Sequence, residues 1–134
     1  LKVLAKELKV KSQVHFMGWQ NAVTPYAAAA DAWLVPSRHE PLGNTVLDAW
    51  VHHTPVVASM TAGPRSLIEH EGSGLLVPVG DAPALAHAMQ RVMEDPKLVR
   101  QLTKTGYKKY QQRFSEDVVV KQYVALYQKL QRKT

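Results

Sequence analysis

The chain has 134 residues, 46% of them hydrophobic, which suffices for one domain with a single buried core. It contains no cysteine, which excludes disulfides and thiolate metal sites and fits a reducing compartment. No apolar run approaches the roughly 18 residues that a membrane helix needs. The net charge of +6 is uneven: residues 1–96 carry seven Lys/Arg and nine Asp/Glu, whereas residues 97–134 carry ten and two.

The first part of the chain alternates short apolar runs with helical patterns. Leu residues at positions 1, 4 and 8 recur at helical spacing and predict the end of an amphipathic helix over residues 1–9. The pattern further predicts strands over residues 13–17, 32–35, 55–59 and 74–77, with helices between them over residues 22–30, 43–52 and 64–70. The strands are apolar on both faces, as parallel strands covered by helices are. The sequence therefore predicts an α/β fold, a Rossmann-like parallel sheet with helices on both faces.

After Gly80 the pattern is helical throughout. Asp81 and Asp95 are each followed within two residues by proline, which is tolerated in the first turn of a helix that an aspartate caps. The second of these helices is expected to run to about Arg113. Ser115, followed by two acidic residues, indicates the N-terminus of a third helix. Three C-terminal helices are therefore expected after the sheet.

Residues 37–49 carry most of the functional information. Glu40 falls in the loop after the strand predicted at residues 32–35, and Asp48 falls about a turn and a half into the helix that begins near Gly43. A strand, a glycine turn and a helix N-terminus together bind anions, because unpaired N–H groups and the helix dipole face the turn. A carboxylate on each side would hold hydroxyls that flank a phosphate. The predicted ligand is a phosphorylated sugar or a nucleotide.

The turn itself is expected to bind phosphate through its backbone. Gly43 and Asn44 would supply N–H groups, and Gly43 would allow close approach of phosphate oxygens. The Thr45 hydroxyl would add one hydrogen bond. Because this device supplies positive potential, no metal is expected. His52 and His53 are adjacent and cannot share a helical face as metal ligands.

The segment between the motif helix and the next strand is short. A helix must stop and a strand must begin within residues 50–55, which a residue in the left-handed conformation achieves most directly. The sequence predicts a positive φ at His53, because His is among the non-glycine residues that tolerate it.

Residues 37–49 resemble the Glu-x7-Glu motif of retaining GT-B glycosyltransferases of the family-4 type (group 1). In that family the motif lies in the C-terminal, donor-binding domain. Residues 14–18 are similar to the strand and glycine before the nucleotide-base loop, and residues 54–59 and 72–77 are similar to two core strands. These matches occur in the expected order over about residues 1–95.

The resemblance implies that residues 1–134 form a single nucleotide-sugar donor-binding domain of a longer chain. An N-terminal acceptor domain and an Arg/Lys pair for the diphosphate would lie upstream of Leu1, and the last helix would cross back onto that acceptor domain. The isolated chain is therefore expected to be inactive. The whole enzyme would transfer a sugar from a nucleoside diphosphate sugar to an acceptor with retention, without a metal or other cofactor.

The resemblance also assigns roles to residues. Glu40 would be the catalytic residue that contacts the donor sugar hydroxyls and orients the anomeric carbon, without acting as a nucleophile. Asp48 stands where the family usually has a Glu that binds the ribose, so its shorter reach leaves the mode of ribose binding open. The expected donor-binding residues are Gly18, Trp19, Ser37, Leu42, Gly43, Asn44, Thr45 and Asp48.

Two other functions remain open. A sugar-nucleotide epimerase shares the GT-B architecture, although no catalytic acid or base of that kind is identifiable. A noncatalytic nucleotide-binding domain would keep the fold with an altered site, and Asp48 is the feature that favours it.

The basic residues 97–134 raise the question of a partner. Their charge fits a solvated helical face or peripheral association with an anionic membrane surface. Nucleic acid is not expected, because aromatic residues are not interleaved with the basic ones in a recognised binding motif. The expected location is the cytoplasm. The domain would be either free there or attached peripherally to the inner face of the membrane.

Overall fold

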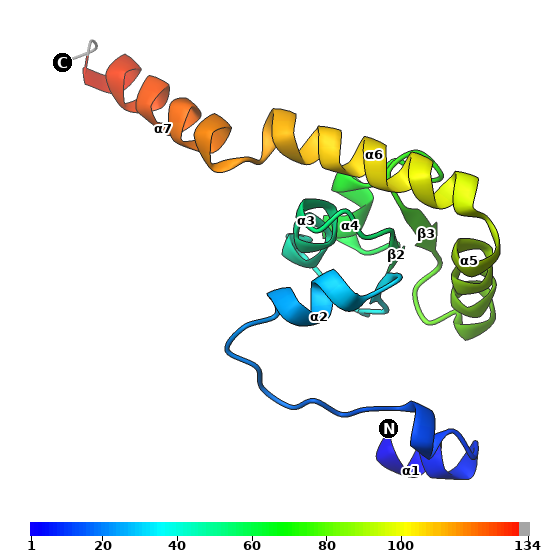
Figure 1. The fold of residues 1–134 in the computed structure, drawn as a ribbon. Coiled ribbons are helices and arrows are strands. Elements are labelled where there is room, and N and C mark those ends of the chain that lie inside the picture. The colour runs from blue at the N-terminus through cyan, green and yellow to red at the C-terminus, as the bar shows by residue number, and fades with distance from the viewer. Residues whose placement is uncertain (132–134) are drawn as a thin grey trace.

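A three-stranded parallel sheet lies at the centre of a computed structural model of the protein, which describes residues 1–131 (Figure 1). The strands are adjacent in the order β1-β2-β3, with Leu34 opposite Val57 and Ala58 opposite Leu76. The predicted α/β fold with a parallel sheet is therefore confirmed. In chain order the elements are α1 (Lys2–Glu7), η1 (Lys11–Gln13), α2 (Thr24–Ala29), β1 (Trp33–Val35), α3 (Asn44–Val51), β2 (Val56–Ser59), α4 (Ala62–Leu67), β3 (Leu75–Val77), α5 (Ala82–Glu94), α6 (Pro96–Arg113) and α7 (Glu116–Gln131).

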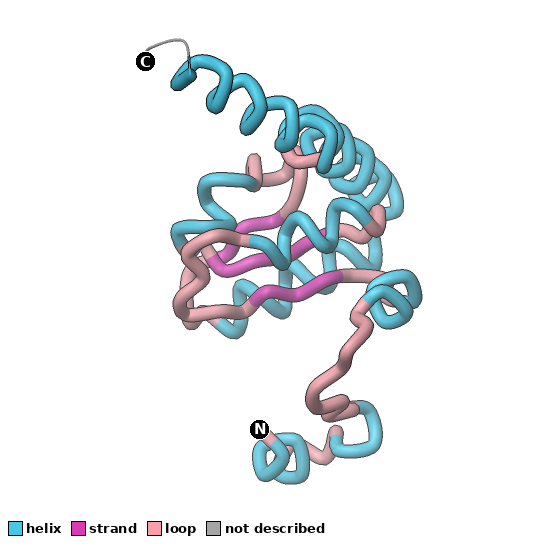
Figure 2. The backbone as a smooth tube through the Cα atoms, turned by 90° about the vertical axis from the view of Figure 1, so that its left-hand side faces the viewer, coloured by secondary structure: helices cyan, strands magenta, loops and turns pink. Residues whose placement is uncertain are grey.

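Helices cover both faces of the sheet, as the apolar strands predicted (Figure 2). Every residue of β2 is buried, and its side chains alternate between two cores. Val56 and Ala58 pack with α3, whose Trp50 is 1% exposed. Val57 packs on the opposite face, with residues of β3, α5 and α6. The sheet is therefore a buried middle layer, and its loops are left to form a site.

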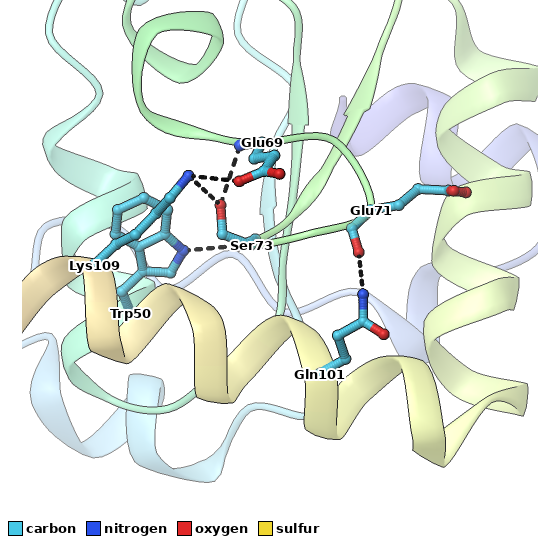
Figure 3. Close-up of polar contacts among 6 residues, drawn as sticks. All are labelled: Trp50, Glu69, Glu71, Ser73, Gln101 and Lys109. Atoms are coloured by element: carbon cyan, nitrogen blue, oxygen red, sulfur yellow. Dashed lines mark hydrogen bonds and ion pairs between the residues drawn. The ribbon is translucent and has the colours of Figure 1, made fainter.

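Helix α6 crosses the edge of the sheet where the strands begin (Figure 3). The Trp50 indole donates a hydrogen bond to the Ser73 carbonyl (2.8 Å), just before β3. Gly106 of α6 lies against this indole, and a Cβ at residue 106 would come within 2.5 Å of the indole nitrogen. Lys109 pairs with Glu69 (3.3 Å) in the same loop. These contacts fix α6 at the amino edge of the sheet.

The end of α3 has the expected left-handed residue. His53 has φ 55°, which confirms the prediction. Its N–H donates to Trp50 O (3.1 Å) and the Thr54 N–H donates to Ala49 O (2.9 Å), the two bonds of a Schellman motif. The His53 ring also packs on Tyr107 of α6, with 3.8 Å between ring centroids.

The strand predicted over residues 13–17 is wrong. Residues 11–13 form η1, and residues 14–18 form no strand ladder with any described strand. Phe16 and Met17 are exposed. Figure 1 shows the segment between η1 and α2 running clear of the sheet. An apolar run becomes a strand only when a neighbouring strand pairs with its backbone, and here it has none within residues 1–131.

The three C-terminal helices are confirmed. The Asp81 carboxylate accepts from Ala84 N–H (2.9 Å), and the Asp95 carboxylate accepts from Leu98 N–H (3.0 Å). The Ser115 hydroxyl, just before α7, donates back to Gln111 O (3.0 Å) in α6. Helix α7 has no buried residue within its bounds and projects beyond the sheet (Figure 1). No helix in residues 1–131 has both the length and the apolar composition to cross a membrane.

Candidate functional site

A groove of about 350 Å³ lies at the carboxyl edge of the sheet, opposite the amino edge that α6 covers. The loops that follow all three strands contribute to it, as parallel strands bring their carboxyl ends to one edge. The lining residues are Arg38, His39, Glu40, Pro41, Thr61, Ala62 and Val79. Of the residues proposed from the sequence, Glu40 is the one that lines this groove.

The Glu40 carboxylate is held by the turn that begins α3. Its Oε1 accepts a hydrogen bond from the Gly43 N–H at 2.8 Å, and the side chain is part-buried. Its carbonyl oxygen accepts from the Gly63 N–H, also at 2.8 Å, at the start of α4. The loop is thus fixed at both backbone and side chain, and the carboxylate is kept at the wall of the groove.

Two glycines allow α3 and α4 to begin side by side. Gly43 has φ 81°, a left-handed conformation that favours glycine. A Cβ on Gly63 would lie 2.6 Å from the Leu42 carbonyl carbon and 2.9 Å from Glu40 O, closer than real contacts allow. A Cβ on Gly43 would lie 2.8 Å from a methyl of Leu67. The sequence predicted a turn glycine at position 43, but it did not predict the contact of Gly43 with Gly63.

Of the two N–H groups expected to bind phosphate, that of Gly43 is already donated to the Glu40 carboxylate, and Gly43 itself is buried. Asn44 is exposed at the helix start, and Asp48 is exposed one turn later, so both are open to a ligand. The Thr45 Oγ1 is different: it is buried and has no hydrogen-bond partner in the described part of the chain. Contact with a phosphate would require this hydroxyl to turn outward. No residue of α3 lines the groove itself; the N-terminus of α3, with its backbone donors and helix dipole, adjoins the groove through the hydrogen bond from Gly43 N–H to Glu40.

None of the predicted donor-binding residues, in α3 or elsewhere, lines the groove. Ser37 is half-buried in the loop after β1, and Leu42 is 69% exposed without lining the groove. Gly18 has φ 66°, as a turn glycine would, and the Trp19 side chain is 90% exposed. The Trp19 indole donates to Asn21 within its own loop (3.1 Å). Donor contacts for these residues remain predictions.

Thr61 and Val79 line the groove but were not predicted. Thr61 directly precedes α4 and Val79 follows β3, so each stands just beyond the carboxyl end of a strand. That position in a parallel sheet is the signal that identifies them. Among residues 1–131 no three His, Cys, Asp or Glu side chains are grouped to hold a metal ion. A site without metal remains a prediction.

Comparison with known proteins identifies the family and the fold of the chain. The family described as glycosyl transferases group 1 matches residues 1–109. The lipopolysaccharide core biosynthesis glycosyltransferase LpsE of Rhizobium meliloti (strain 1021) is 36% identical over 123 residues, covering 92% of this chain and 36% of that protein. The chain thus spans about a third of the length of the relatives it matches.

Solved structures give the same result. A sucrose-phosphate synthase from Thermosynechococcus elongatus superposes with a TM-score of 0.90 at 35% identity, covering 99% of this chain and 34% of that one. The Anabaena protein HepE, solved in complex with UDP, superposes with a TM-score of 0.88 at 25% identity, covering 93% and 35%. The chain belongs to the group 1 glycosyltransferase family of the GT-B fold.

Proposed function

We propose that residues 1–134 form the donor-binding domain of a retaining glycosyltransferase that uses a nucleoside diphosphate sugar. The observation that carries the proposal is the placement of Glu40 at the groove wall, tied by 2.8 Å hydrogen bonds to the starts of both α3 and α4. The UDP complex of the similar Anabaena protein supports a nucleotide ligand. The acceptor, the acceptor domain and the remaining donor contacts belong to the rest of the enzyme.

In this proposal the first turn of α3 binds the donor diphosphate. The N–H groups beginning at Asn44 and the dipole of α3 offset the negative charge without a metal. Glu40 accepts hydrogen bonds from the donor sugar, and Asp48, one turn along α3, faces the ribose. The shorter Asp side chain would reach the ribose hydroxyls directly or through one water.

The reaction replaces one bond at the anomeric carbon by another. The acceptor hydroxyl oxygen bonds to the anomeric carbon as the bond to the diphosphate oxygen breaks, and the hydroxyl proton passes to the departing diphosphate. Attack from the face that the diphosphate leaves gives retention. Glu40 stabilises the sugar during this exchange through hydrogen bonds that strengthen as positive charge develops at the anomeric carbon.

Glu40→Gln in the whole enzyme tests the proposal. Turnover with saturating donor should fall about tenfold to a hundredfold, because a charged hydrogen bond to the reacting sugar is replaced by a neutral one. Glu94→Gln is the matched control, since Glu94 lies on the exposed face of α5 and hydrogen-bonds Gln90. Unchanged turnover in Glu40→Gln, with both variants folded, would remove Glu40 from the site.

A further inference from the structure

Four basic residues form a continuous strip along α6. Lys97, Arg100, Lys104 and Lys108 are all exposed, and their spacings of three, four and four residues place them on one helical face. The buried residues of the same helix, Leu98, Leu102 and Gly106, lie on the opposite face. We call these four residues the cationic strip. Because α6 has 18 residues, the helix is about 27 Å long and the strip follows it from its first turn to its fourth.

The charge of the cationic strip is not neutralised within the described chain. Residues 96–115 contain no Asp or Glu. The ion pairs of residues 1–131 join Lys109 to Glu69 and Arg91 to Glu71, and neither involves the strip. Four unpaired cations on one face make a local field that attracts anionic partners.

The cationic strip and the candidate donor groove belong to opposite edges of the sheet. On its inner side α6 contacts residues that precede the strands: Tyr107 packs on His53 before β2, and Gln101 donates to Glu71 O (2.9 Å) before β3 (Figure 3). The groove is built from loops that follow the strands. The strip therefore plays no part in binding a donor at the groove.

We propose that the cationic strip docks the domain on an anionic lipid surface. The strip is straight and faces outward from the sheet, so a planar surface of negative charge can contact all four residues together. The aromatic residues of α6, Tyr107 and Tyr110, pack inward against His53 and the core, so the strip has no platform for stacked nucleotide bases. This argues against single-stranded nucleic acid, and α6 carries no recognised duplex-binding motif, so lipid is favoured.

Docking in this orientation leaves the donor groove accessible. The groove, on the far edge of the sheet, would face the aqueous phase, from which a water-soluble nucleotide sugar arrives. The attraction is electrostatic, since the apolar residues of α6 are turned into the core. It should therefore weaken strongly with salt, because the Debye length falls from about 10 Å at 0.1 M to about 3 Å at 1 M. This inference is independent of the proposed function.

Vesicle sedimentation tests the proposal. The 134-residue chain should bind vesicles of phosphatidylcholine with phosphatidylglycerol but not vesicles of phosphatidylcholine alone. The bound chain should be released at about 1 M salt. Changing all four strip residues to Gln should lower the partition constant at least about 100-fold, since each cation near such a surface contributes about fivefold. The charge-preserving variant Lys97→Arg, Lys104→Arg, Lys108→Arg should still bind, and circular dichroism should show native helix in both.

The matched control removes the same charge elsewhere. Lys2, Lys6, Lys9 and Lys11 are exposed in and around α1 and η1, and their change to Gln should leave vesicle binding largely intact. Equal loss in the control and the strip variant would overturn the proposal, since net charge alone would explain the binding. A wild-type chain that ignores the anionic vesicles would also overturn it. Loss of duplex DNA binding in the strip variant, without vesicle binding by the wild type, would assign the strip to nucleic acid instead.

Discussion

The backbones of Gly43 and Gly63 are in contact beside Glu40. The starts of α3 and α4 are therefore both hydrogen-bonded to the Glu40 loop. Gly63 N–H donates to Glu40 O, and the Glu40 carboxylate accepts from Gly43 N–H. A Cβ on Gly63 would collide with backbone, and a Cβ on Gly43 would require the Leu67 side chain to shift. This close approach sets the wall of the candidate groove, because both ends of the Glu40 loop depend on it.

Gly63→Ala should therefore be destabilising. Its Cβ would collide with the backbone around Leu42 and Gly43, which cannot move as a flexible side chain can. We expect a loss of about 1–3 kcal/mol in unfolding free energy, measured by urea denaturation. Gly72→Ala is the control, because the three atoms nearest to its Cβ, at 3.1–3.4 Å, belong to the Glu69 side chain and not to backbone. Equal stability of the two variants would show that the loop can open without cost.

Gly106→Ala gives a test in which two effects have opposite signs. In an exposed helix the change to alanine would stabilise by about 1 kcal/mol. In α6 the Cβ meets the buried Trp50 indole, so we expect a net loss of about 1–3 kcal/mol. The melting temperature, measured by thermal unfolding, shows whether the net change in stability is positive or negative. A higher melting temperature in the variant would mean that α6 does not lie against Trp50.

The order of elements was predictable because its signals are local. Aspartate before proline marks the starts of α5 and α6, and both carboxylates cap their helices as expected. The short segment after α3 predicted the left-handed His53, since few residues were available to turn the chain. Such features depend on residues a few positions apart, which a sequence displays directly.

The contacts that shape the site were less predictable. Gly63 lies 20 residues from Gly43, and Gly106 lies 56 residues from Trp50, so nothing in the local sequence pairs them. The failed strand at residues 13–17 has the same cause, because its formation depends on a neighbour rather than on its own apolar residues. Close contacts between residues far apart in the sequence are set by the packing of the whole fold.

His53→Gly should change stability by less than about 1 kcal/mol. Glycine relieves the cost of a positive φ, about 1 kcal/mol or more, whereas loss of the ring contact with Tyr107 costs about 0.5–1.5 kcal/mol. The two nearly cancel. A double-mutant cycle with Tyr107→Ala isolates the ring contact, and a coupling energy of zero would show that the rings do not interact in solution.

The pKa of Glu71 should be low and should depend on Arg91. The Arg91 guanidinium hydrogen-bonds the carboxylate at 2.7 Å and, with its positive charge, lowers the pKa of Glu71. A lowered carboxylate pKa stabilises the fold above the ordinary glutamate value of about 4.3, and this is lost as pH falls through the folded value. NMR titration should show the pKa rising in Arg91→Gln. An identical titration curve in both proteins would contradict the ion pair.

The most direct test of the donor-binding account is an NMR titration of the ¹⁵N-labelled chain with UDP. We expect a dissociation constant on the order of 0.1–1 mM, equivalent to about 4–5.5 kcal/mol, because part of the proposed site belongs to the rest of the enzyme. The largest shifts should fall at the amides of Asn44 and Thr45, with smaller ones at Gly43 and Asp48. Shifts elsewhere in the chain, or none at about 10 mM UDP, would contradict the proposed donor site.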